Sequence, residues 1–175
     1  MFNGIIQNTG KISNITKKGK NCTLIVTSKI NFTKKEIGSS ISCSGTCLTL
    51  ENTKRKFNQF YLSKETLNRT NFKYANKGDI INIEKSIKYG DRISGHFVQG
   101  HVDTICKIKN IIFAGKSWIV NFTLPRKFKK YIIYKGSIAI NGVSLTISKI
   151  LKYGFQVVII PKTLKMTNLI YLKKK

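Results

Sequence analysis

The sequence contains few acidic residues and almost no proline. It has 7 Asp and Glu against 32 Lys and Arg, which gives a formal net charge of +25 at pH 7, and 2 Pro in 175 residues. No apolar run approaches the roughly 20 residues that a membrane-spanning helix needs, and residues 1–10 do not have the pattern of a secretory signal. We therefore expect a cytoplasmic chain with no membrane partner. The 41% of hydrophobic residues excludes a wholly disordered chain and allows one domain or two small ones.

Arginine is also scarce, with four residues among the basic ones: Arg55, Arg69, Arg92 and Arg126. Nucleic-acid readers tend to use arginine for bidentate contacts with bases and phosphates. The lysines are spread along the whole chain, and 3 Ala stand against 27 Ile. This composition is typical of an AT-rich genome. We therefore interpret most of the charge as the result of mutational drift that converted surface positions to lysine, and we expect no specific nucleic-acid partner. The alternative is an electrostatic nucleic-acid binder, whose affinity would fall steeply with salt.

Cysteine is too rare for a disulfide scaffold, with Cys22, Cys43, Cys47 and Cys106 as the four residues. Cys43 and Cys47 could be drawn as a zinc site with His96 and His101. The sequence has no tight Cys-x2-Cys pair, however. We therefore interpret the cysteines as reduced thiols and expect no bound metal.

The chain repeats itself. Residues 4–12 align with residues 100–108 at an offset of 96, and residues 45–50 align with residues 142–147 at an offset of 97. Residues 64–71 align with residues 161–168, again at 97. Three blocks in the same order and nearly the same register indicate an internal duplication. We place the two copies at residues 1–94 and 95–175.

Each copy has the pattern of a small β-barrel. Short β-branched or alternating runs predict strands at residues 22–26, 80–83, 118–122 and 156–160, with glycine-bearing turns between such runs. We also expect short helices at residues 64–67 and 126–131. In the second copy nothing corresponds to residues 79–84, so that barrel is predicted to lack its final strand. One hypothesis is slippage in an A-rich tract that encodes Lys173, Lys174 and Lys175.

Five segments carry a resemblance to a known family. They are residues 1–7, 45–49, 64–67, 95–103 and 134–146, and the block Gly95-His96-Phe97-Val98-Gln99-Gly100-His101 is the most specific. The sequence resembles the riboflavin synthases of the flavin-forming type over essentially its whole length. The resemblance implies an all-β chain of two tandem six-stranded Greek-key barrels. That family also has a C-terminal helix that holds a trimer together. This sequence has no counterpart of the helix or of the final strand, which argues against the trimer.

The resemblance implies a reaction without cofactor or metal. Two molecules of 6,7-dimethyl-8-ribityllumazine exchange a four-carbon unit and give riboflavin and 5-amino-6-ribitylamino-uracil. The protein must bring two flat rings together and exclude water. Association with lumazine synthase is a further expectation for the family. The alternative is a binding module that holds lumazine or flavin without turnover, or a decaying truncated synthase.

The resemblance also implies two substrate pockets. The first is expected to be lined by Gly4, Ile5, Ile6, Cys47, Leu48, Thr49, Tyr61, Leu62, Ser63, Lys64, Glu65 and Thr66. The second is expected to be lined by Gly100, His101, Val102, Lys135, Asn141, Ser144, Leu145, Thr146, Ile160, Pro161, Lys162, Thr163, Leu164 and Lys165.

The two copies differ at matched positions, and the differences suggest catalytic roles. His101 stands where the first copy has Ile5, and Ser144 stands where it has Cys47. A histidine exchanges protons near neutral pH, so we expect His101 to do acid–base work, with Ser144 and Thr146 positioning or activating a water. Cys47 is a candidate nucleophile or polar contact, and His96 is interpreted as structural.

Two positions depart from the family. Asn141 stands where relatives often carry Asp, which weakens any mechanism that needs a carboxylate there, because an amide is no base at neutral pH. Ser44 stands where Asn is common.

Overall fold

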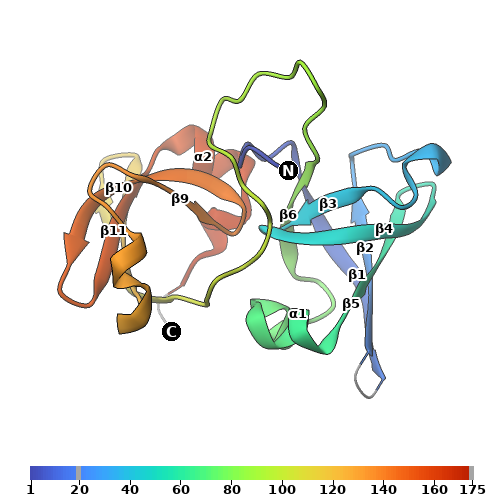
Figure 1. Cartoon of the computed structure of the whole chain (residues 1–175), viewed down its shortest axis with the longest axis horizontal. Coiled ribbons are helices and arrows are strands. Elements are labelled where there is room, and N and C mark those ends of the chain that lie inside the picture. Colours follow the sequence, from blue (N-terminus) through green and yellow to red (C-terminus); the bar gives the residue numbers. More distant parts are fainter. Residues whose placement is uncertain (19–20, 174–175) are drawn as a thin grey trace.

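The structure is a computed structural model that describes residues 1–18 and 21–173. Two all-β halves lie side by side, and the connection between them crosses the middle of the molecule (Figure 1). None of the helices in this described part is long and apolar enough to cross a membrane. Lys174 and Lys175, part of the tract on which the slippage hypothesis rests, lie outside the described residues.

The first half is a closed barrel of antiparallel strands in the order β1-β2-β5-β4-β3-β6. Its strands are β1 (Asn8–Lys18), β2 (Asn21–Ser28), β3 (Ser40–Cys43), β4 (Thr46–Lys54), β5 (Phe57–Leu62) and β6 (Ile80–Lys85). Three short helices join them, namely η1 (Lys34–Glu36), α1 (Lys64–Arg69) and η2 (Asn71–Tyr74). The pairing of β2 with β5 gives the Greek-key order that the family resemblance implied.

The second half repeats this order with five strands, β7-β8-β11-β10-β9. The strands are β7 (Lys107–Ala114), β8 (Ser117–Thr123), β9 (Ser137–Ile140), β10 (Val143–Leu151) and β11 (Gly154–Ile159). Its helices are η3 (Arg126–Tyr131), α2 (Pro161–Met166) and η4 (Asn168–Tyr171). Within the described residues the sixth strand is missing, as predicted. We call the halves barrel one and barrel two.

Alternating burial explains why these residues form these strands. In β4 the side chains of Leu48 and Leu50 are buried in the core of barrel one, whereas Thr49 between them is exposed. In β10 the equivalent residues Leu145 and Ile147 are buried in a separate core. Period-two alternation is the sign of a strand with one face on a core. Each barrel therefore has its own core, and polar side chains are left on the outer faces.

The repeat extends to irregularities of the sheets. The ladder between β4 and β5 shifts register between Leu50 and Asn52, and the ladder between β10 and β11 shifts between Ile147 and Lys149. These positions are 97 residues apart. The predicted helix at residues 126–131 is the 3-10 helix η3. The predicted strand at residues 156–160 ends at Ile159, because Ile160 is the N-cap of α2.

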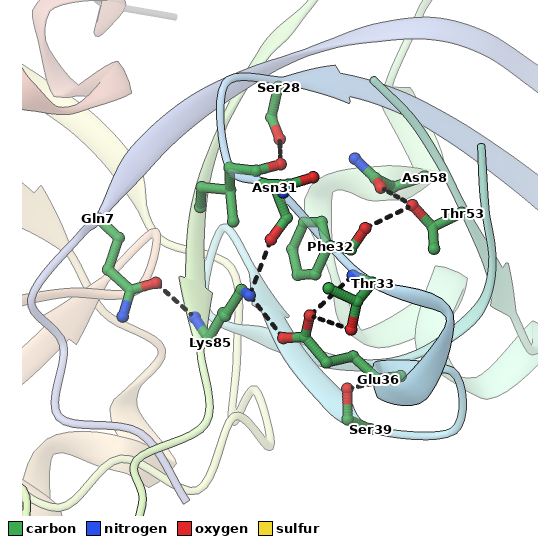
Figure 2. A network of polar contacts seen from close by, with 11 residues as sticks. Gln7, Ser28, Asn31, Phe32, Thr33, Glu36, Ser39, Thr53, Asn58 and Lys85 are labelled. Atoms are coloured by element: carbon green, nitrogen blue, oxygen red, sulfur yellow. Dashed lines mark hydrogen bonds and ion pairs between the residues drawn. The ribbon is translucent and has the colours of Figure 1, made fainter. Parts of the chain in front are cut away.

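A network of polar contacts surrounds Lys85 at the end of β6 (Figure 2). The Nζ of Lys85 donates to the Glu36 carboxylate and to the carbonyl of Asn31, and it lies 4.8 Å from the centroid of the buried Phe32 ring. The other carboxylate oxygen of Glu36 accepts from the Thr33 N–H at 2.8 Å. These contacts tie the loop at residues 29–39 to the last strand of the barrel.

The Glu36→Gln variant is expected to be less stable than wild type by about 1 kcal/mol at pH 7, the size of a partly exposed charged hydrogen bond. The hydrogen bond from Lys85 is the main cause that lowers the pKa of the Glu36 carboxyl. A lowered pKa in the folded state stabilises the protein above the unfolded pKa, and this contribution is lost as the pH falls through the folded pKa. Urea unfolding at pH 7 and near pH 3 measures both effects. Glu51→Gln, at an exposed carboxylate bonded to Gln59, is the matched control. A pH-independent difference would contradict the assignment.

Candidate functional site

The segment that leads into each barrel, with Gly4 in the first copy and Gly100 in the second, contacts the other barrel. We call these two the leading segments. The carbonyl of Gly4 accepts a 2.8 Å hydrogen bond from the N–H of Ser144 in barrel two, and the carbonyl of Gly100 accepts a 2.8 Å bond from the N–H of Cys47 in barrel one. Gly4 and Gly100 are counterparts in the repeat, and so are Cys47 and Ser144. Phe2 and Val98, again counterparts, pair with each other as an isolated antiparallel bridge. The repeat is thus folded with approximate twofold symmetry.

Glycine is required where the segments meet the strands. Gly4 has φ +75° and Gly100 has φ +80°, in the left-handed region that favours glycine. A Cβ on Gly4 would lie 2.7 Å from the Cβ of Ser144, and one on Gly100 would lie 2.7 Å from the Cβ of Cys47. The main chain therefore approaches each strand more closely than any side chain would allow.

This exchange corrects the expected grouping of the pocket residues. The sequence analysis placed Gly4, Ile5 and Ile6 with Cys47, but the structure places their segment on β10 beside Ser144, and Ile6 is 5% exposed in the core of barrel two. Likewise the segment of His101 lies on β4 beside Cys47. The repeat shows which residues are equivalent but not which barrel each segment contacts.

We call the first arrangement the Cys47 site, comprising Cys47, Thr49, Tyr61 and residues 100–102. Cys47 and Thr49 alternate with buried residues, so both lie on the outer face of β4. The register of β4 with β5 begins only at Leu50 and Phe60. Residues Thr46 to Thr49 of β4 are therefore not paired with β5. In this part of β4 the N–H of Cys47 donates to the carbonyl of Gly100. The segment of Gly100 therefore lies along the part of β4 that β5 leaves unpaired.

The equivalent arrangement is the Ser144 site, comprising Ser144, Thr146, His96 and residues 4–6. Ser144 is half-buried and Thr146 exposed, between the buried Val143, Leu145 and Ile147. The register of β10 with β11 begins at Ile147 and Val157, the counterparts of Leu50 and Phe60. The same backbone arrangement, a strand end contacted by a glycine segment from the other copy, is therefore present twice, with different side chains. We call this arrangement the frame.

His96, which the sequence analysis interpreted as structural, contacts Ser144 directly. Its Nδ1 lies 2.8 Å from the Ser144 Oγ, and the N–H of His96 donates to the carbonyl of Asn3. Burial lowers the pKa of the His96 imidazole from its ordinary value, so the neutral ring predominates at pH 7. A neutral imidazole next to a serine hydroxyl is able to accept a proton from it or through it.

Three comparisons with known proteins agree with this geometry. Residues 3–86 and 99–175 match the lumazine binding domain family. The riboflavin synthase of Buchnera aphidicola subsp. Schizaphis graminum is 39% identical over 97% of this chain and 82% of its own. The riboflavin synthase of Escherichia coli strain K12 is 35% identical over 97% and 80%.

The chain belongs to the riboflavin synthase family. Its fold also matches the crystal structure of LumP complexed with riboflavin, at a TM-score of 0.87 and 26% identity, over 99% of this chain and 95% of that one. The two matched segments of the family correspond to the two barrels.

Several of the residues that the resemblance placed in the substrate pockets have side chains that are buried in the barrel cores. They are Ile6, Leu48, Leu62, Leu145 and Leu164, all at most 9% exposed. At these positions only the main chain is available to a ligand. Two more of these residues, Ser63 and Thr66, cap the N-terminus of α1. The Ser63 Oγ accepts from the N–H of Thr66 at 3.1 Å and lies 3.0 Å from the Thr66 Oγ1. Contact with substrate remains a prediction for the remaining residues.

Lys135 and Asn141 both have positive φ, at +63° and +48°. The N–H of Lys135 donates to the carbonyl of Ile147, as Gly38 does to Leu50 in barrel one, and its exposed side chain lies beside Tyr134. The carbonyl of Asn141 accepts from the side chain of the buried Asn82 at 2.8 Å. Asn141 therefore links barrel two to barrel one in this chain.

The thiols differ in their surroundings. Burial raises the pKa of the fully buried Cys43 strongly and that of Cys106 to about 11, so both stay protonated. Burial also raises the pKa of Cys22. Cys47 is only half-buried and lies at the site. Among residues 1–18 and 21–173, no three His, Cys, Asp or Glu side chains are grouped so that they could hold a metal ion.

Proposed function

We propose that this chain catalyses the riboflavin synthase reaction, in which two molecules of 6,7-dimethyl-8-ribityllumazine give riboflavin and 5-amino-6-ribitylamino-uracil. The observation that carries the proposal is the duplicated frame, with Gly4 on Ser144 and Gly100 on Cys47 at the same 2.8 Å distance. Two identical substrates need two similar binding sites. Membership of the family supplies the substrate class.

The different side chains in the two frames suit different roles in the reaction. The Ser144 site contains His96, Ser144 and Thr146, and its crossing segment has the apolar Ile5. The Cys47 site contains Cys47 and Thr49, and its crossing segment has His101. We infer that the lumazine bound at one site gives up the four-carbon unit and the lumazine at the other receives it. Deprotonation of an acidic ring methyl begins the transfer, and each site has one histidine, His96 or His101, as a candidate proton acceptor.

We further infer that His96 and Ser144 act together as a proton relay. The 2.8 Å contact joins the two side chains, and the lowered pKa of His96 supplies a neutral base at pH 7. This replaces the expected partnership of Ser144 with His101. His101 is proposed to act at the Cys47 site, whose main chain its segment contacts.

The assembly in solution remains a proposal from the family. The expectations are a homotrimer, association with lumazine synthase and a cytoplasmic location. Analytical ultracentrifugation of the purified chain, alone and with lumazine synthase, tests the first two.

The direct test is to incubate the purified chain with 6,7-dimethyl-8-ribityllumazine and follow riboflavin fluorescence, with binding measured separately by titration. Formation of riboflavin is the expected result. Saturable lumazine binding without turnover would replace the synthase by the non-catalytic binding module. Failure to bind lumazine would contradict both functions.

The His101→Ala variant is expected to lose turnover far more than lumazine affinity, because an acid–base group acts mainly in the transition state. A fall in kcat of about a hundredfold with a Kd change below about threefold is the expected pattern. Stopped-flow turnover and equilibrium titration measure the two quantities. Ile112→Val, at an exposed residue of β7 outside both sites, is the control and should change neither. Equal losses of kcat and affinity would assign His101 to ground-state binding.

A further inference from the structure

Glu84, on β6, is a buried carboxylate that contacts the leading segment of Gly4. It is 2% exposed, and although the chain has 32 Lys and Arg, none of them forms an ion pair with it in the part of the chain that the structure describes. Its Oε1 accepts from the N–H of Asn3 at 2.7 Å, and both of its oxygens accept from the N–H of Gly4 at 3.2 Å. A buried carboxylate is costly unless it is hydrogen-bonded. The main chain of the leading segment therefore supplies the polar partners of Glu84.

The peptide unit between Asn3 and Gly4 joins Glu84 to the relay. Its N–H, on Gly4, donates to Glu84, and its C=O, on Asn3, accepts from the N–H of His96 at 3.1 Å. A trans peptide unit is planar, and its N–H and C=O point in opposite directions. A contact that fixes the N–H on one side therefore fixes the direction of the C=O on the other. Glu84 thus determines how the Asn3 carbonyl meets the main chain of His96.

The carbonyl of Gly4 makes the second connection to the relay. It accepts from the N–H of Ser144 at 2.8 Å, and the Nδ1 of His96 lies 2.8 Å from the Ser144 Oγ. A Cβ on Gly95 would lie 2.9 Å from the Ser144 Cβ, so the chain before His96 also packs closely on β10. Two consecutive residues of the leading segment thus bond to Glu84 through their N–H groups and to the relay through their C=O groups.

Glu84 holds a part of the chain that has no regular secondary structure. Residues 3–7 form neither a strand nor a helix. They are fixed at one end by the isolated bridge at Phe2 and at the other by the hydrogen bond from the N–H of Gln7 to β6. Among the described residues, the N–H groups of the first two have no acceptor other than this carboxylate. Removing it leaves their shared peptide unit free to turn, because the adjoining glycine allows many backbone conformations.

We propose that Glu84 is a positioning residue for the proposed reaction, because its carboxylate fixes the peptide unit that sets the contact between His96 and Ser144. It acts through the main chain of the leading segment. The inference rests on the proposed function and adds to the Ser144 site a residue from the last strand of barrel one. A purely structural Glu84 would stabilise the fold without altering the relay, so the two roles are separable by measurement.

The first test is made without substrate and does not depend on turnover. The chain has 2 His, so the ring resonances of His96 and His101 can be titrated separately by NMR. Glu84→Gln replaces one acceptor oxygen with an NH₂ donor and keeps the size of the side chain. We expect the ring of His96 to be less buried in this variant and its pKa to rise toward the ordinary value of about 6.5. The resonances of His101 should stay as in the wild type.

The sign of this shift separates positioning from a direct effect of charge. Loss of a negative charge near an imidazole lowers its pKa, whereas loss of burial raises it. An unchanged or lowered pKa of His96 in Glu84→Gln would overturn the proposal. Because this measurement needs no lumazine, absence of turnover in the wild type would contradict the proposed function and leave the titration decisive for the position of His96.

The second test compares turnover with affinity. Glu84→Ala is expected to lower kcat by at least about tenfold and to change the lumazine Kd by less than about threefold, because misplacing a catalytic group by about 1 Å can cost roughly a hundredfold in rate. Glu84→Gln keeps one acceptor oxygen and should retain more turnover than Glu84→Ala. A loss of affinity as large as the loss of kcat would assign Glu84 to substrate binding and refute the positioning role.

Asn58→Ala is the matched control for lost stability. Asn58 is also buried in barrel one, at 1% exposed, and its side chain bonds to Thr53 of β4 at 2.9 Å and to the carbonyl of Val26 of β2 rather than to the leading segment (Figure 2). This variant should unfold at a lower urea concentration than the wild type but keep its kcat and its His96 titration. If it loses as much turnover as Glu84→Ala, the effect of Glu84 is one of stability and the proposal fails. If Glu84→Ala does not fold, Glu84→Gln decides by the same readouts.

Discussion

Replacing His96 with alanine is expected to lower kcat by about a hundredfold or more, since positioned acid–base groups contribute roughly 10²–10⁴-fold. The lumazine Kd should change by less than about threefold, because Ser144 and the crossing segment remain in place. The expectation rests on the 2.8 Å contact between His96 Nδ1 and Ser144 Oγ. Single-turnover kinetics and equilibrium titration of the same variant measure both quantities.

The pH profile separates this role from simple packing. Burial lowers the pKa of His96, so the neutral ring persists to a pH below the ordinary histidine value of about 6.5. Activity should therefore fall only when the pH drops through that lowered pKa, and His96→Ala should lose this acid limb. Ser144→Ala is the companion variant, and the double variant should be no slower than the worse single one if the pair acts as a unit. An unchanged acid limb in His96→Ala would contradict the relay.

Gly100→Ala is expected to have the second large effect, a loss of about 2–6 kcal/mol in the free energy of unfolding together with loss of turnover. The new Cβ would lie 2.7 Å from the Cβ of Cys47, and the residue has φ +80°. Left-handed strain and overpacking each cost roughly 1–3 kcal/mol. Gly4→Ala should behave in the same way at the Ser144 site, where the same distance is 2.7 Å. Urea unfolding and turnover assays measure the losses.

A matched glycine separates the two causes. Gly90 has φ +87°, yet a Cβ there would have no heavy atom within 4 Å. Gly90→Ala should therefore show the strain alone, about 1 kcal/mol, and leave turnover unchanged. If Gly100→Ala costs no more than Gly90→Ala, the close approach to Cys47 does not constrain the fold.

The repeat in the sequence predicted the fold well because self-alignment reports equivalence directly. Leu50 and Ile147 align, and both begin the matching ladders; the predicted strands at residues 22–26 and 118–122 lie within β2 and β8. Self-alignment carries no information on contacts, however. The segment of Gly4 is equally compatible with either barrel until its hydrogen bond to Ser144 is seen. The pocket grouping was therefore wrong although its residues were sensibly chosen by type.

The contact between His96 and Ser144 was not predicted, for a related reason. At the offset of 96 the counterpart of His96 would precede Met1, so the alignment of the two copies gives no residue to compare with His96. His101 attracted attention because Ile5 stands opposite it in the alignment. A signal for His96 was present only in its position five residues before His101, within the segment that crosses to the other barrel. Spacing of this kind indicates a shared segment but gives no partner.

The exchange of leading segments between the barrels has a consequence for how such a gene evolves. Each site is half the product of one copy and half of the other, so selection on one site acts on both halves of the gene. Loss of either copy would remove part of both sites rather than one whole site. Tandem fusion keeps each segment at a high effective concentration near the strand that it contacts. It also guarantees that unlike copies pair, which leaves them free to diverge at matched positions, as Ile5 and His101 or Cys47 and Ser144 have done.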